Sequence, residues 1–388
     1  MNTTVHPASN YSCFSINKPP FLKSSIAAVQ YSSTFAALGL TSNLIAFIVL
    51  LKSFQRVQSR SRSFFLIFLG GLVVTDFMGL LVTGSIVISF YITQFSWPDI
   101  DPYCHFCNFM GMSMVFYGLS PLLLGATMAI ERFIGINRPF ARSTSMPKSR
   151  TVSMVLMVWL IAGCIALLPL VGLGSYHLQM PGSWCFFNIS SEGYDMAFSL
   201  IFSLVGLISI AVSFLLNTVS VITLIRVCCG QDRSQRRRDH EVEMMVQLIL
   251  IMLIASICWC PLLIYVLMSV VTATSVWSEN LLFCIRMATW NQIFDPWIYI
   301  IFQLSRLRSL LPKLCCPERV SRAVFQRVYP RFGSSRGSIM TLYPSFRDTV
   351  RRFTRSSLGS NLGSDQTEEK EDSNVRPEPA SKPPPASL

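Results

Sequence analysis

The sequence predicts an all-α membrane protein, a bundle of seven membrane-spanning helices followed by a short amphipathic helix and a disordered tail. The first observation is composition: of 388 residues, 51% are hydrophobic and only 13% are charged, which is unlike a soluble domain. The second is length, because about 20 apolar residues suffice to cross a bilayer as a helix. Seven stretches qualify, at residues 26–51, 63–92, 107–136, 151–174, 196–228, 243–272 and 280–303.

The third observation is where the basic residues lie. Of 32 lysines and arginines, 29 lie in or beside the loops after the first, third and fifth stretches, or in the tail after residue 303. Cytoplasmic loops carry such an excess, so we expect a plasma-membrane protein with its amino terminus outside and its carboxyl terminus in the cytoplasm. The net charge of +12 does not indicate nucleic-acid binding, since these cations form no soluble basic face.

Residues 1–25 lack the plan of a cleaved signal peptide, so the first membrane stretch is expected to act as an uncleaved anchor. Glycosylation sequons begin at Asn2, Asn10 and Asn188, all on the side that the charge pattern makes extracellular. Domain 1–25 is therefore an extracellular, glycosylated segment, and 26–303 is the membrane bundle.

Polar residues inside the first, second and seventh stretches predict a buried cluster. Asn43, Asp76, Asn291 and Asp295 each lie in otherwise apolar sequence, where an ionisable group must find a polar partner. We expect them to meet in one pocket that a sodium ion or water completes. The alternative is that they only hold the helices together.

Four cysteines fall on the expected extracellular side: Cys13, Cys104, Cys107 and Cys185. An even number in an oxidising compartment predicts disulfides, and four cysteines allow three connectivities. The other eight are expected to be reduced. Cys185 follows a Pro-Gly turn and lies among aromatic residues, which indicates a lid.

Two further places favour a conformational switch. Glu131 and Arg132 end the third stretch, either as an ordinary ion pair or as an arginine that can exchange partners. Trp259 precedes Pro261 in the sixth stretch, where a proline permits a kink. Trp259 either senses a ligand beside that hinge or is only a packing residue between helices.

The seventh stretch carries Arg286 about 10 Å from its expected outer end at helical rise. One interpretation is an arginine that reaches up to the lipid headgroups. The other is a ligand site, because no acidic residue of that stretch lies near it in sequence and Trp290, four residues on, shares its face. A guanidinium binds a carboxylate through two hydrogen bonds.

Beyond the bundle, residues 304–316 alternate apolar and basic residues and predict an amphipathic helix on the membrane surface. Cys315 and Cys316 offer a palmitoylation site. Residues 317–388 have the composition of a disordered cytoplasmic tail, with serines and threonines that can be phosphorylated.

Residues already named, in this order and spacing, resemble the rhodopsin-like G-protein-coupled receptors across all seven stretches. The matching positions are Asn43, Asp76, Glu131 to Phe133, Trp159, Cys258 to Pro261, and Asp295 to Tyr299. The chain departs from the general pattern with Glu at 131, Asp at 295 and no proline within 195–228. The prostanoid receptors look the same at these positions. Motifs similar to theirs are LLVTG (80–84), GLSPLLLG (118–125), PGSWCF (181–186), FLLNTVS (214–220), EVEMM (241–245) and RMATWNQ (286–292).

The resemblance implies a site for a prostanoid, a carboxylate lipid, with Arg286 as its cation. The implied lining is Thr83, Tyr91, Ser183, Trp184, Phe186, Leu282, Trp290 and Trp259. Several prostaglandin E receptors carry Tyr where this chain has Tyr91, whereas other prostanoid receptors can carry His, so a prostaglandin E or F type or another carboxylate lipid stays an alternative. The resemblance also implies the disulfides Cys107–Cys185 and Cys13–Cys104, the latter as in one branch of the family.

The implied function is a receptor that signals through a heterotrimeric G protein of the Gq class to phospholipase C and calcium. Arrestin and receptor kinases are expected partners of the tail. The implied switch residues are Glu131, Arg132, Asp76, Pro261, Asp295, Pro296 and Tyr299. No cofactor or metal is expected, apart from sodium near Asp76. A transporter would need inverted repeats or broken helices. An enzyme would need convergent catalytic groups, yet no histidine lies inside a membrane stretch and no HExxH or GxSxG signature occurs.

Overall fold

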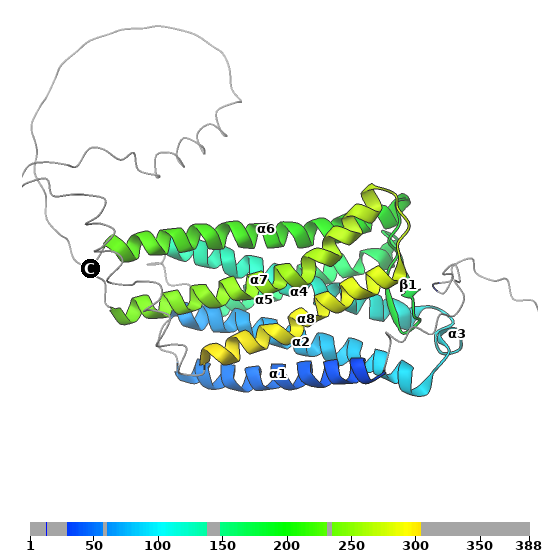
Figure 1. The fold of residues 1–388 in the computed structure, drawn as a ribbon, viewed down its shortest axis with the longest axis horizontal. Coiled ribbons are helices and arrows are strands. Elements are labelled where there is room, and N and C mark those ends of the chain that lie inside the picture. Colours follow the sequence, from blue (N-terminus) through cyan, green and yellow to red (C-terminus); the bar gives the residue numbers. More distant parts are fainter. Residues whose placement is uncertain (1–12, 14–28, 57–59, 138–147, 231–234, 304–388) are drawn as a thin grey trace, which may run out of the picture. The chain divides into compact units, whose positions relative to one another are not determined.

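Seven long helices form one bundle in the computed structural model, which describes Cys13 and residues 29–56, 60–137, 148–230 and 235–303 (Figure 1). The long helices are α1 (Val29–Arg56), α2 (Arg60–Thr93), α4 (His105–Asn137), α5 (Lys148–Leu167), α6 (Gly193–Gly230), α7 (Gln235–Val271) and α8 (Ser278–Gln303). Each predicted membrane stretch falls on one of them. A short 3-10 helix, η2 (Leu168–Val171), continues α5.

Several sequence predictions concern residues outside the described ranges. They are the sequons at Asn2 and Asn10, the amphipathic helix 304–316, the cysteines Cys315 and Cys316, and the tail 317–388.

Six of the seven long helices are apolar enough, by length and composition, to cross a membrane: α1, α2, α4, α5, α6 and α7. The helix α8 is long enough but carries too many polar residues. Its polar side chains face the bundle, with Asn291 and Asp295 only 1% and 2% exposed. Its most exposed side chains in the membrane-spanning part are apolar, among them Phe283 at 63% and Trp297 at 45%. Because this arrangement hides polar groups from lipid, α8 fits the membrane as the seventh helix.

The outer surface of the bundle is apolar, as a lipid-facing surface requires. Large hydrophobic side chains stand exposed on several helices, including Leu38, Leu156, Ile208 and Leu215, each more than half exposed. Scattered exposed apolar residues are ordinary in soluble proteins, but contiguous ones along long helices mark contact with lipid. The structure and the sequence together therefore describe a multi-pass membrane protein.

The helix α4 lies at the centre of the bundle and packs against α2, α5, α6 and α7. In turn, α8 packs along α7 and α1 and also contacts α2. The seventh helix thus has neighbours on three sides, and those neighbours supply the partners of its buried polar residues.

A two-stranded hairpin caps the end of the bundle where α1 begins, together with the short helix α3 (Trp97–Ile100) (Figure 1). We call this end the hairpin end. Strands β1 (Tyr176–Gln179) and β2 (Trp184–Phe187) pair antiparallel, with Tyr176 opposite Phe187. Every residue of β2 is buried. The hydroxyl of Tyr176 donates to the Ala166 carbonyl at 2.7 Å, which ties the hairpin to α5.

Two disulfides fix the cap. Cys107–Cys185 joins the start of α4 to the middle of β2, and Cys13–Cys104 joins the amino-terminal segment to the turn before α4. The Leu178 amide also donates to the Cys13 carbonyl at 3.0 Å. Both connectivities that the family resemblance implied are present. Cys164, Cys258, Cys260 and Cys284 are free cysteines.

Candidate functional site

Beneath the hairpin, the bundle encloses two adjoining cavities. We call them the outer chamber, of about 130 Å³, and the inner chamber, of about 50 Å³. Thr83, Met114, Ile285 and Thr289 line both, so the chambers adjoin. Together they form an internal site that begins at the cap and descends between α2, α4 and α8.

The outer chamber brings together most of the predicted ligand residues. Its lining includes Thr83, Tyr91, Ser183, Trp184, Leu282 and Arg286. Tyr91 donates its hydroxyl hydrogen to Ser183 Oγ at 3.3 Å, which links α2 to the turn of the hairpin. Arg286 is the cation among these six residues, and its guanidinium carbon lies 4.6 Å from the ring centre of Tyr31. The outer chamber therefore has a positive group in a largely apolar wall.

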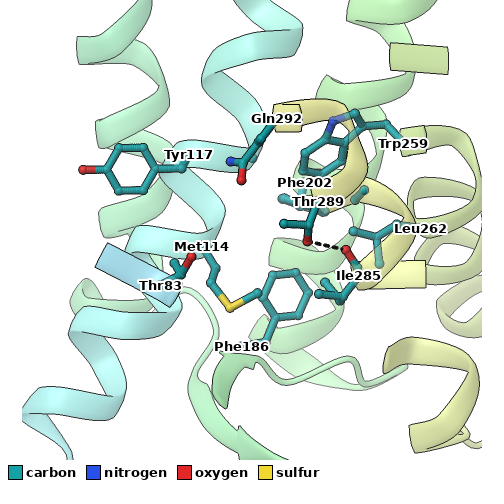
Figure 2. A pocket seen from close by; sticks show the side chains of 12 residues that line it. Thr83, Met114, Tyr117, Phe186, Phe202, Trp259, Leu262, Ile285, Thr289 and Gln292 are labelled. Carbon is teal, nitrogen blue, oxygen red and sulfur yellow. Dashed lines mark hydrogen bonds between the residues drawn. The ribbon is translucent and has the colours of Figure 1, made fainter. Parts of the chain in front are cut away.

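The inner chamber lies between the hairpin and the middle of α7. Figure 2 shows Phe186 at one end and Trp259 and Gln292 toward the other, with Met114 between them. Trp259 is 6% exposed and packs against Gly118 of α4, where an added Cβ would lie 2.7 Å from its ring. The indole can occupy this position only because residue 118 has no side chain.

Trp290 is the predicted ligand residue that the structure does not bring into either chamber. Its ring meets Phe35 of α1 edge-on, with 4.9 Å between centroids, and stacks on Phe294 at 5.3 Å. The chamber face of α8 carries Leu282, Ile285, Arg286 and Thr289 instead. This is the i, i+3, i+4, i+7 pattern of one helix face. At 100° per residue, Trp290 lies about 40° beyond Arg286, at the edge of this face, where it meets α1.

Sequence reasoning missed further lining residues: Tyr31, Ser32 and Phe35 of α1, Met110 and Met114 of α4, and Thr289 and Gln292 of α8. Helical spacing from Arg286 offered a signal for Thr289, three residues on. No sequence signal marks the α1 residues, because their place depends on how α1 packs against α8.

Hydroxyl groups in the site bond to their own helices. Thr83 donates to the Gly79 carbonyl at 2.6 Å, and Thr289 donates to the Ile285 carbonyl at 2.7 Å (Figure 2). Their oxygens still present lone pairs to the cavity. The whole arrangement suits a long amphiphile with an anionic head at Arg286 and an apolar body below it.

A buried polar core lies deeper, on the far side of Trp259. Asn43, Asp76, Asn291 and Asp295 are all at most 2% exposed. Asn43 donates to the Gln292 carbonyl at 2.8 Å, and Asn291 donates to Asp295 at 2.9 Å. Both oxygens of Asp76 are buried without a hydrogen-bond partner among the described residues. All four predicted residues are therefore buried, and the pocket with its sodium ion or water stays a prediction.

The predicted switch residues are spread along the bundle, with Glu131 and Arg132 in the last turns of α4, toward the end opposite the hairpin. Nε of Arg132 is 3.5 Å from Oε2 of Glu131, and Arg132 is 2% exposed. Pro261 and Pro296 lie inside α7 and α8, and Tyr299 of α8 is 1% exposed. The structure thus holds Arg132 folded against its neighbouring carboxylate.

A separate polar cluster stands behind the hairpin. Ser175 Oγ donates to Asp195 at 2.9 Å and lies 2.9 Å from His177 Nε2. Asn188, the described sequon residue, is half-buried and donates to the other oxygen of Asp195 at 2.8 Å. Burial lowers the pKa of the His177 imidazole, while the Asp195 carboxylate and a hydrogen bond to the Cys13 backbone oppose that shift.

Seven helices around a buried polar core, with a disulfide-bonded cap over an internal site, define a seven-helix membrane receptor rather than an enzyme. A family model for the 7 transmembrane receptor (rhodopsin family) matches residues 42–299. The chain belongs to this family.

Its relatives include two named as thromboxane A2 receptors. The protein from Chlorocebus aethiops is 51% identical over 76% of this chain and 89% of its own length, and that from Bos taurus is 48% identical over 84% and 93%. A prostaglandin F2-alpha receptor from Rattus norvegicus is 38% identical over 81% and 88%. Squid rhodopsin shares the fold, with a TM-score of 0.56 at 18% identity over 79% of this chain and 87% of that chain.

Proposed function

We propose that this chain is a prostanoid receptor whose preferred ligands are thromboxane A2 and its precursor prostaglandin H2. Its relatives named as thromboxane A2 receptors reach 48–51% identity, against 38% for the prostaglandin F2-alpha receptor from rat. The single observation that carries the proposal is the place of Arg286, a cation lining a chamber that adjoins a second, mostly apolar one. Prostanoids combine a carboxylate, which suits the cation of the outer chamber, with a long apolar body, which suits the inner chamber.

In this proposal the ligand carboxylate binds Arg286 through two charge-assisted hydrogen bonds. Thr83 and the Tyr91–Ser183 pair offer further hydrogen bonds near the head group. The apolar body descends past Met114 and Phe186 into the inner chamber. There it contacts the ring of Trp259.

Trp259 connects the ligand to the rest of α7, because it lies two residues before Pro261. An agonist that binds better when the indole is displaced shifts the receptor toward the conformation in which α7 bends outward. Arg132 then leaves Glu131, and the end opposite the hairpin opens to a G protein. We assign the Gq class, and hence phospholipase C and calcium, from the family resemblance.

Orientation and modification follow from the charge pattern. We place the hairpin end and the amino terminus outside the cell and the carboxyl terminus in the cytoplasm. Asn2, Asn10 and Asn188 would then be glycosylation sites, and Cys315 and Cys316 palmitoylation sites. Arrestin and receptor kinases would engage the tail.

The polar core suits a sodium ion. Asp76 supplies two buried oxygens without hydrogen-bond partners in the described part of the chain, and Ser120 and Asn291 add further unpartnered oxygens. Oxygen ligands with one carboxylate are appropriate for a hard monovalent cation. Asp76, Ser120 and Asn291 would hold it, and its charge would offset the burial of the Asp76 carboxylate.

The test is a binding and calcium assay on cells that express the receptor. Arg286→Gln should abolish high-affinity binding of a thromboxane mimetic acid while surface expression stays normal. Arg286→Lys, which keeps the charge but loses the planar fork, should give an intermediate affinity. Normal affinity in Arg286→Gln would refute the carboxylate site.

A receptor for another prostanoid is the second candidate, and Tyr91 favours it. Its hydroxyl bonds to Ser183 within the outer chamber, so the residue that differs among prostanoid receptors lies near the head group. A panel of thromboxane mimetic and prostaglandins E2, F2α, D2 and I2 in the same calcium assay decides between them.

A further inference from the structure

The guanidinium of Arg286 lies over the ring of Tyr31, with 4.6 Å between the Arg286 Cζ atom and the ring centre. Tyr31 belongs to the first turn of α1, and Arg286 lies two turns into α8. Both side chains line the outer chamber. Nothing in the sequence pairs these two residues, which are far apart in the chain and meet because α1 packs along α8.

This geometry lets the ring and a carboxylate bind the same guanidinium together. A cation within about 6 Å of an aromatic ring centre is attracted to the negative face of the ring. Arginine stacks on aromatic faces, and in that arrangement the flat face of the guanidinium makes the contact. Its N–H groups point outward in the plane of the group, so bidentate hydrogen bonds are made at the edge and do not compete with the ring for the flat face.

Tyr31 is itself held in place by a row of aromatic rings. It stacks on Phe35 with 5.8 Å between centroids, Phe35 meets Trp290 edge-on at 4.9 Å, and Trp290 stacks on Phe294 at 5.3 Å. The row runs from α1 to α8, the helix that carries Arg286. The row also explains the position of Trp290, which packs between Phe35 and Phe294 and does not line either chamber.

A long arginine side chain loses rotamer freedom when it is fixed against a ligand. A contact that fixes the guanidinium before the ligand arrives removes part of that cost and raises affinity by preorganisation. We propose that Tyr31 is a positioning residue that holds the Arg286 guanidinium in its carboxylate-binding orientation by a cation–π contact. The inference rests on the proposed function, since it requires an anionic ligand head at Arg286.

The experiment compares a thromboxane mimetic acid with its methyl ester in competition binding. Tyr31→Leu should lower the affinity for the acid by about 2- to 30-fold, the range that a cation–π contact spans from exposed to desolvated sites. The ester, which has no negative charge, should bind Tyr31→Leu as it binds the wild type. Tyr31→Phe keeps the ring face and should bind the acid normally.

The matched control is Phe294→Leu. It removes a ring from the same aromatic row but lies outside both chambers and two turns from Arg286. If Tyr31 acted only by supporting the helices, this control would lower acid and ester binding as Tyr31→Leu does. The inference requires that Phe294→Leu leave the ratio of acid to ester affinity unchanged.

If Tyr31→Leu does not reach the cell surface, fluorinated phenylalanines at position 31 replace it. Stepwise fluorination weakens the negative ring face at nearly constant size, so acid affinity should fall with each fluorine. Unchanged acid affinity along that series, or equal losses for acid and ester in Tyr31→Leu, would overturn the inference. If Arg286→Gln lowers the affinity for the acid but Tyr31→Leu does not, this inference alone is refuted. If Arg286→Gln leaves that affinity unchanged, the proposed function is refuted.

Discussion

Arg132 lies between Glu131 and an aromatic ring. Its Nε atom is 3.5 Å from Oε2 of Glu131, and its Cζ atom is 5.3 Å from the ring centre of Phe65 on α2. With a side chain only 2% exposed, Arg132 is withdrawn from the surface at the end opposite the hairpin. In the proposed mechanism that end opens only when Arg132 is released, because the ion pair and the ring both favour the closed position.

Replacing the carboxylate should therefore favour the open state. We expect Glu131→Gln to raise basal signalling about 2- to 5-fold, since a partly exposed ion pair contributes at most about 1 kcal/mol. The measurement is nucleotide exchange on a co-expressed G protein without agonist, normalised to surface receptor. Glu131→Asp retains the charge and serves as control. Basal exchange equal to wild type in Glu131→Gln would show that the pair does not restrain Arg132.

The two disulfides should differ in what they support. Cys185 lies between Trp184 and Phe186, which line the outer and inner chambers, so loss of Cys107–Cys185 frees the strand that forms the roof of the site. Cys13–Cys104 holds the amino-terminal segment against the hairpin through the bond from Leu178 to Cys13. The paired variant Cys13→Ser/Cys104→Ser should fold with about 2–4 kcal/mol lower stability.

Radioligand binding and thermal inactivation distinguish the two bonds. Cys13→Ser/Cys104→Ser should keep surface expression and measurable binding, with a lower inactivation temperature. Cys107→Ser/Cys185→Ser should lose binding altogether. The reverse ranking would show that the hairpin is held mainly through residue 13.

The sequence predicted the helices because each is long, apolar and set off by charged loops. It predicted the polar core for a physical reason as well: Asp76 and Asp295 cannot face lipid, so they must face each other's helices. The hairpin was expected only as a lid. Its strands are four residues each, too short for an alternation pattern to stand out.

The binding site was predicted less completely than the bundle. Arg286 stood out as a charge in an apolar stretch, but the choice between Thr289 and Trp290 depends on the rotation of α8 about its axis. That rotation depends on how α8 packs against α7, α1 and α2, and Phe35 of α1 meets the Trp290 ring. Residues of α1 such as Tyr31 have no sequence signature, because packing alone brings them to the site.

Stability of the cap should depend on pH through His177. Burial lowers the pKa of this imidazole in the folded protein, with Asp195 and the Cys13 backbone opposing. As pH falls through about 6.5, the ordinary value for histidine, the unfolded chain takes up a proton that the folded chain resists, so folding stability falls. Above that pH the imidazole is neutral in both the folded and the unfolded chain, so this loss of folding stability does not occur.

The inactivation temperature of the purified receptor, measured between pH 7.5 and 5.5, checks this expectation. His177→Gln keeps a hydrogen-bonding side chain but cannot titrate, so it should lose less stability on acidification than the wild type does. A steeper loss in His177→Gln would mean that the buried imidazole gains a proton more readily in the fold.

Gly118 and Gly125 of α4 offer a matched pair for testing the position of Trp259. Both are helical glycines two turns apart, so alanine should stabilise the helix by about 1 kcal/mol at either position. At Gly125 an added Cβ meets nothing within 4 Å, whereas at Gly118 it would lie 2.7 Å from the Trp259 ring. Because the indole is rigid and 6% exposed, Gly118→Ala should cost about 1–3 kcal/mol from overpacking.

Thermal inactivation and ligand binding should then separate the two variants. Gly118→Ala should inactivate about 2–12 °C below Gly125→Ala, and it should bind the thromboxane mimetic more weakly because Trp259 forms one wall of the inner chamber. Gly125→Ala should match or exceed the wild-type temperature. If both variants behave alike, Trp259 does not rest against Gly118, and the contact between the ligand site and the Pro261 hinge must run through another residue of α7.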